Sequence, residues 1–137
     1  MAIDRMDWHY GGDFPDDLAD ECGGTHIGMY LAWIINNDLH GERHREDSTE
    51  SIKKLKNREI IGRDFLIDEC DEKFWVEDLN EVGEAFTEYY YDEFYYEDYE
   101  NALIGSLPSI YHIENSWGNY DKIASVLDKR FNEWKSE

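Results

Sequence analysis

Two short histidine patterns are the first residues in this sequence whose types and spacing suit chemistry. Cys22 and His26 are spaced C-x3-H beside two glycines, at the expected start of a helix. A helix start favours the thiolate form of a cysteine, and a neighbouring imidazole can act as its base. No third residue in a recognisable motif orients the histidine. We therefore expect an ordinary loop cysteine next to a histidine of the helix start.

His40 and His44 form the second pattern, H-x3-H. One helical turn would place both imidazoles on one face, as in many metal sites. The stretch "HGERH" has Gly41 between the histidines and lacks the glutamate position of H-E-x-x-H. We expect a polar connection here rather than a metal site.

Other patterns that carry chemistry are absent from the sequence. There is no calcium loop, no phosphate-binding glycine loop and no G-x-S-x-G motif. We expect no enzyme, no cofactor and no bound metal. The alternative is a small enzyme or a metal-binding domain that uses His26 with Cys22, His9, or the His40 and His44 pair.

The charge of the chain points to a different kind of activity. Its 137 residues carry a net charge of −20, with 33 acids and 13 Lys or Arg. Such a surface repels nucleic acid and anionic membranes and attracts basic proteins. We therefore expect a basic protein partner, no direct binding of nucleic acid and no membrane.

Length and composition indicate a single domain that spans residues 1–137. Aromatic residues make up 15% of the chain, which is too many for a disordered protein. Two cysteines do not form a disulfide framework, and the first residues contain no apolar run of a signal peptide. The longest apolar stretch, Ile27–Ile35, is too short to span a bilayer. These features predict a cytoplasmic location.

The elements that must position these residues are mainly α-helical. We expect about five helices around a buried central helix at 26–38 that Thr25 caps, because this run is apolar on every face. An irregular arm precedes it, and one short strand pair is possible, with a strand near 110–113. The other expected helices cover 48–62, 63–74 with Phe65, Leu66 and Cys70 inward, 77–103, and 120–137 after an Asn119 cap. The last of these carries an apolar stripe of Tyr120, Ile123, Ala124, Leu127, Phe131 and Trp134.

The stretch "EYYYDEFYYEDYE", Glu88–Glu100, contains only aromatic and acidic residues. It lies in a segment, Asp64 to Glu100, with fifteen acids and one base, Lys73. Helical spacing assigns Val82, Phe86, Tyr90 and Phe94 to the core and leaves Tyr91 and Tyr95 outside it. Tyrosine surrounded by carboxylates suits a surface that binds a basic partner. The predicted partner-binding residues are Glu88, Tyr91, Asp92, Glu93, Tyr95, Glu97 and Asp98.

Four stretches carry a resemblance to a known family: "WHYGGDFP", "GGTHIGMYLAWIINNDL", "GRDFLIDECDEKF" and "YHIENSWGNYDKIASVLDKRFNEWK". Together they resemble an uncharacterised family of small bacterial single-domain proteins, for which no activity, cofactor or catalytic residue is established. In overall type the chain also resembles bacterial toxin-immunity proteins. We expect an immunity or antitoxin-type inhibitor that masks the surface or active site of a basic toxin, of which a nucleic-acid-targeting toxin is one kind. A DNA mimic is a further alternative.

Overall fold

The computed structural model describes residues 2–11 and 14–136, so Gly12 and Asp13 of the "WHYGGDFP" stretch lie outside the described residues. In chain order the longer elements are β1 (Ala2–Arg5), α1 (Asp7–Tyr10), α2 (Thr25–Asn36), α3 (Glu42–Asp47), α4 (Thr49–Lys56), α5 (Gly62–Cys70), β2 (Lys73–Trp75), α6 (Glu81–Tyr90), α7 (Tyr96–Leu103) and α8 (Trp117–Lys135). Single turns of 3-10 helix cover Asp20–Gly24, Val76–Asp78 and Ile110–His112, and a π-helical turn covers Tyr91–Tyr95. The predicted mainly α-helical fold is confirmed.

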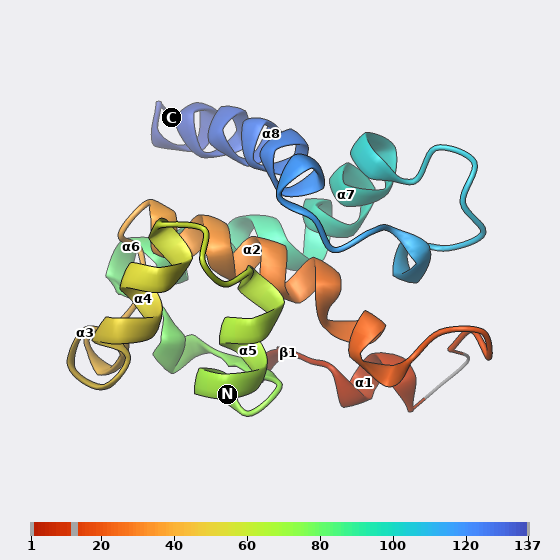
Figure 1. The fold of residues 1–137 in the computed structure, drawn as a ribbon. Coiled ribbons are helices and arrows are strands. Elements are labelled where there is room, and N and C mark those ends of the chain that lie inside the picture. Colours follow the sequence, from red (N-terminus) through yellow and green to blue (C-terminus); the bar gives the residue numbers. More distant parts are fainter. Residues whose placement is uncertain (1, 12–13, 137) are drawn as a thin grey trace.

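Helix α2 is the centre of the core. Every residue from Thr25 to Ile35 is buried, as a run apolar on all faces requires. Helices α5 and α8 contact α2 and lie on opposite sides of it in Figure 1. The prediction of a buried central helix is thus confirmed. The prediction that Thr25 caps this helix is wrong. The N-cap is Gly24, and the Thr25 hydroxyl instead accepts a hydrogen bond from Arg63 at 3.1 Å.

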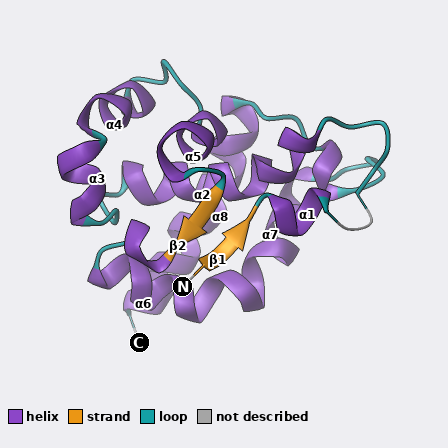
Figure 2. Cartoon of the chain, turned by 90° about the horizontal axis from the view of Figure 1, so that it is seen from below, coloured by secondary structure: helices purple, strands orange, loops and turns teal. Residues whose placement is uncertain are grey.

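The strand pair joins the start of the chain to its middle. Strands β1 and β2 run antiparallel side by side (Figure 2), and Asp4 is the partner of Phe74 across the pair. A strand near 110–113 was a wrong expectation, since Ile110–His112 form a 3-10 turn there. The pairing fixes the N-terminal arm against the body and buries Asp4, which is only 2% exposed.

The segment 77–103 differs most from the single helix that we expected. Helix α6 begins later, after Asn80, whose side chain accepts a hydrogen bond from Gly83 N at 2.8 Å. The π-helical turn Tyr91–Tyr95 then separates α6 from α7. A π-helical turn holds one residue more than an α-helical turn, so the buried face moves one position along the sequence.

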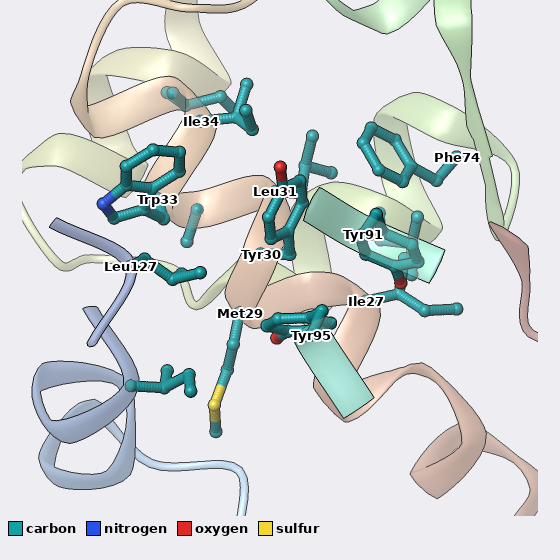
Figure 3. Packing of buried hydrophobic residues seen from close by; sticks show 14 of the residues in the cluster. Ile27, Met29, Tyr30, Leu31, Trp33, Ile34, Phe74, Tyr91, Tyr95 and Leu127 are labelled. Carbon is teal, nitrogen blue, oxygen red and sulfur yellow. The ribbon is translucent and has the colours of Figure 1, made fainter. Parts of the chain in front are cut away.

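The predicted exposure of Tyr91 and Tyr95 is therefore wrong. Their exposed fractions are 1% and 0%, and both rings point into the core beside Tyr30 (Figure 3). Val82, which we expected inside, is 46% exposed. The aromatic half of the "EYYYDEFYYEDYE" stretch mostly builds the core.

Helix α8 closes the core from the other side. It begins at Trp117, and its cap is Ser116 rather than Asn119, because the Ser116 hydroxyl accepts from Asn119 N at 3.2 Å. Ile123 and Leu127 are buried against the core, as the apolar stripe predicted. Trp33 of α2 donates from its indole nitrogen to Asp128 of α8 at 2.9 Å.

Candidate functional site

The buried carboxylate of Asp4 is the centre of a polar cluster between the strand pair, α1, α2 and the π-helical turn. Its Oδ2 atom accepts hydrogen bonds from the hydroxyls of Tyr91 at 2.7 Å and Tyr96 at 2.6 Å. Its Oδ1 atom accepts from Arg5 N and lies 2.8 Å from His9 Nε2. An ionised carboxylate is only an acceptor, so four donors in a buried place identify Asp4 as the charged form.

Two imidazoles face this carboxylate from different helices. His9 lies on α1, and its Nδ1 atom is 2.7 Å from the Tyr111 hydroxyl. His26 lies on α2, with its Nε2 atom 3.4 Å from Asp4 Oδ2 and without a hydrogen-bond partner among the described residues. The two rings meet edge to face, with their centroids 4.4 Å apart.

Burial and charge act in opposite directions within this cluster. Burial alone would raise the pKa of Asp4, but the neighbouring His26 and His9 more than offset it, and the pKa of Asp4 is far below its usual value. Burial lowers the pKa of His26, although Asp4 opposes that shift. The cluster therefore holds a carboxylate beside a His26 ring whose charged form burial disfavours.

A second buried cluster joins α3, α4 and α5 through His44. Its Nε2 atom donates to Asp78 Oδ1 at 2.7 Å, and its Nδ1 atom lies 3.2 Å from the Ser48 hydroxyl. Cys70 Sγ is 3.9 Å from the same Nε2 atom. Burial, and then the charge of Asp78, raise the pKa of the Cys70 thiol far above its usual value, so it is not an activated nucleophile. Both nitrogens of His44 have partners, and the cluster stabilises the packing.

The acidic stretch after Asn80 presents its carboxylates in two different ways. Glu88, Asp92, Glu93 and Glu97 are exposed, and none of them forms an ion pair with another described residue. Asp98 is different, because Arg130 of α8 donates two hydrogen bonds to it, each at 3.0 Å. The predicted partner-binding role of Asp98 thus competes with a structural one.

A small pocket lies beside the exposed acids, between α6 and the start of β1. It has a volume of about 150 Å³, and its lining comprises Ala2, Ile3, Val76, Glu84, Thr87, Glu88, Tyr91 and Asp92. The first three residues are apolar, and three of the others are carboxylates. Such a pocket suits the aliphatic stem and charged end of one basic side chain.

Comparison with known protein families gives a single result. The family model described as "Domain of unknown function (DUF7832)" matches residues 2–113. The chain belongs to this family. No curated protein and no solved structure matches the chain. The matched DUF7832 region contains both histidine clusters and the pocket, and α8 follows it.

The structure changes the pairing of the residues that the sequence singled out in this DUF7832 chain. His26 meets His9 and Asp4 rather than Cys22, and His44 meets Asp78 rather than His40. The expected polar connection around His44 is helix α3, which turns that ring inward. Asp4 was not singled out, because no local spacing relates it to His26. Only the β1 pairing brings them together.

Within the described residues, no helix has both the length and the apolar composition that crossing a membrane requires.

Proposed function

We propose that this chain is an acidic binding protein of the immunity or antitoxin type, which covers the surface or active site of a basic protein partner. The observation that carries the proposal is the row of carboxylates beside the pocket, which runs from α6 through the π-helical turn into α7. All but the half-buried Glu84 are exposed, and none forms an ion pair with another described residue. Tyr91 and Tyr95 are buried, so Tyr95 is no longer part of the binding surface and Tyr91 contributes only to the lining of the pocket. The recognising groups are instead Glu84, Glu88, Asp92, Glu93 and Glu97.

Among the described residues, lysine and arginine side chains do not neutralise the carboxylates beside the pocket. Lys56 pairs with Asp38, and Arg58 pairs with Asp121, each at 2.6 Å. Arg43 of α3 has a weak 3.9 Å contact with Asp78, which is itself fully buried. The charge of the α6 face is therefore available to an outside cation, whose approach it accelerates.

The pocket adds selectivity to this attraction. Exposed ion pairs alone contribute little free energy, because water screens them. The apolar lining residues Ala2, Ile3 and Val76 let a lysine or arginine bury its aliphatic stem. Its charged end then meets Glu84, Glu88 and Asp92. A guanidinium has the planar geometry for two-point contact with a carboxylate, so arginine is the side chain that we favour.

The test is a photo-crosslinking residue in place of Glu88, introduced into the full chain in its native host. The expected result is a covalent complex with one basic protein, identified by mass spectrometry. A crosslinker at Glu50, an exposed acid of α4, is the matched control. Capture of nothing, or of the same proteins from both positions, would overturn the proposal. A captured DNA-binding protein would instead favour the DNA mimic.

Charge reversal then tests the chemistry of the contact. Glu84→Lys, Glu88→Lys and Asp92→Lys in one variant should abolish binding of the crosslinked partner. The control variant reverses three exposed acids elsewhere: Glu46→Lys, Asp47→Lys and Glu50→Lys. Equal loss in both variants would mean that net charge alone drives the association. In the wild-type chain, added salt should slow association.

A further inference from the structure

His26 Nε2 is a buried polar atom that the protein alone does not satisfy. The residue is 1% exposed, and no described group completes a hydrogen bond with this nitrogen. A buried nitrogen without a partner costs free energy, so most proteins avoid one. This nitrogen lies 3.4 Å from Asp4 Oδ2, and the His26 ring meets the His9 ring edge to face.

We propose that Asp4, His9 and His26 bind one divalent transition-metal ion, of which Zn²⁺ is the representative. One ligand atom from each residue lies within 4.8 Å of the other two. Zinc binds imidazole nitrogen at about 2.0–2.1 Å and carboxylate oxygen at about 2.0–2.2 Å. Small rotations of the three side chains bring their ligand atoms to these distances. A water or a ligand would complete the coordination.

The surrounding tyrosines are arranged to hold these ligands in place. Tyr91 and Tyr96 donate to Asp4 Oδ2, and Arg5 N donates to Oδ1, so the carboxylate is held from both sides. The contact that a metal ion would replace is the one between Oδ1 and His9 Nε2. Tyr111 contacts His9 Nδ1, the ring nitrogen away from Asp4. Metal-binding histidines and carboxylates usually have such outer partners, which fix the ring orientation and strengthen binding.

Metal binding requires one change of proton position. Without metal, the His9 tautomer with its proton on Nε2 donates to Asp4 Oδ1, while Nδ1 accepts from the Tyr111 hydroxyl. With metal, Nε2 gives its electron pair to the ion, the proton resides on Nδ1, and Tyr111 becomes the acceptor. In this exchange Nε2 releases its proton to solvent, Nδ1 takes one up from solvent, and the Tyr111 hydroxyl rotates to accept from Nδ1.

The His44 cluster is a weaker candidate for the same chemistry. Its imidazole already has partners at both nitrogens, and Trp75 N occupies the second oxygen of Asp78 at 2.7 Å. That cluster has no unpartnered imidazole nitrogen comparable with His26 Nε2. Two imidazoles with one carboxylate also favour transition metals over Ca²⁺ and Mg²⁺, which prefer oxygen ligands.

The test uses the full chain, purified without a histidine tag and stripped with a chelator. Titration with Zn²⁺ should show one ion per chain by calorimetry, and Co²⁺ should give the visible absorption of bound metal. His9→Asn and His26→Asn should each weaken binding at least about tenfold, and Tyr111→Phe should weaken it about tenfold. His40→Asn is the control and should leave the affinity unchanged.

A second measurement needs no variant of the site. In nuclear magnetic resonance spectra of the wild-type chain, Zn²⁺ should move the imidazole signals of His9 and His26 and leave those of His40, His44 and His112. Absence of stoichiometric binding, or movement of the other histidine signals alone, would overturn the proposal even if His26→Asn does not fold. Unchanged affinity in folded His9→Asn would also overturn it.

Discussion

Gly28 of α2 and Gly62 of α5 lie in direct backbone contact, with no side chain between the two glycines. A Cβ atom on Gly62 would overlap the carbonyl oxygen of Gly28, and one on Gly28 would lie 2.5 Å from Arg63 N. The close approach of α5 brings Phe65 and Leu66 onto the central helix, where both are fully buried. Glycine is the residue type that permits such a contact.

Gly62→Ala should therefore destabilise the protein, although alanine is the better helix former. The overlap is with rigid backbone, so we expect a loss of about 3 kcal/mol in the free energy of unfolding, measured with urea. Gly118→Ala in α8 is the matched control, because its Cβ atom would meet only Ser116 Oγ at 3.9 Å. That change should stabilise by about 0.5–1 kcal/mol. Equal effects of the two changes would contradict the close contact.

Two buried tyrosines of the aromatic stretch should respond in opposite ways to loss of the hydroxyl. Tyr95 donates to the carbonyl of His26 at 2.6 Å, whereas the buried Tyr99 hydroxyl has no hydrogen-bond partner among the described residues. Tyr95→Phe should cost about 0.5–1.5 kcal/mol in the free energy of unfolding. Tyr99→Phe should be neutral or stabilising, because it removes an unsatisfied polar group. A comparable loss in both variants would contradict these assignments.

Asp98 should prove to be structural rather than part of the binding surface. Besides Arg130, it accepts a hydrogen bond from the Tyr90 hydroxyl at 2.6 Å. Asp98→Asn should lower the free energy of unfolding by about 1–2 kcal/mol, since Arg130 is partly exposed and water screens the pair. Asp92→Asn, at an exposed acid, should stay within about 0.5 kcal/mol of wild type. If Asp98→Asn is as harmless as Asp92→Asn, the pairing with Arg130 does not stabilise the fold.

The buried tyrosines also predict sensitivity to alkali. Burial raises the pKa of Tyr30 and of Tyr90 well above the ordinary value of about 10. A raised pKa means that the folded chain keeps a proton that the unfolded chain releases, so stability is full below about pH 10 and falls as the pH rises. Tyrosine ionisation, followed by absorbance, should coincide with loss of the helical circular dichroism signal. Complete ionisation with an intact helical signal would contradict this prediction.

The sequence predicted what short-range periodicity determines. The continuous apolar run of α2, the stripe of α8 and the inward side of α5 all follow from helical spacing, and each was confirmed. The same spacing failed after Tyr90. An α-helical step from Tyr90 leads to Phe94, but the π-helical turn delivers Tyr95 to the core instead, and then Tyr99. No residue type in an all-aromatic and acidic stretch signals that turn.

The candidate metal site was harder to predict for a different reason. His9 and His26 stood among the alternatives in the sequence, yet Asp4 joins them only because β1 pairs with β2, some seventy positions away. Long-range strand pairing leaves little trace in one short strand. His44 shows the same difficulty, since its partner Asp78 lies thirty-four positions later.

Helix α8 follows the region that defines DUF7832, and this has a practical consequence for anyone who trims the chain. A fragment that ends at Ile113 would keep both histidine clusters but expose Trp33 and Phe86, whose rings pack against Phe131. The fragment would also lack Arg130, which forms an ion pair with Asp98. Recombinant work on this protein should retain residues to the end of α8, since a shorter product is expected to aggregate through the uncovered aromatic rings.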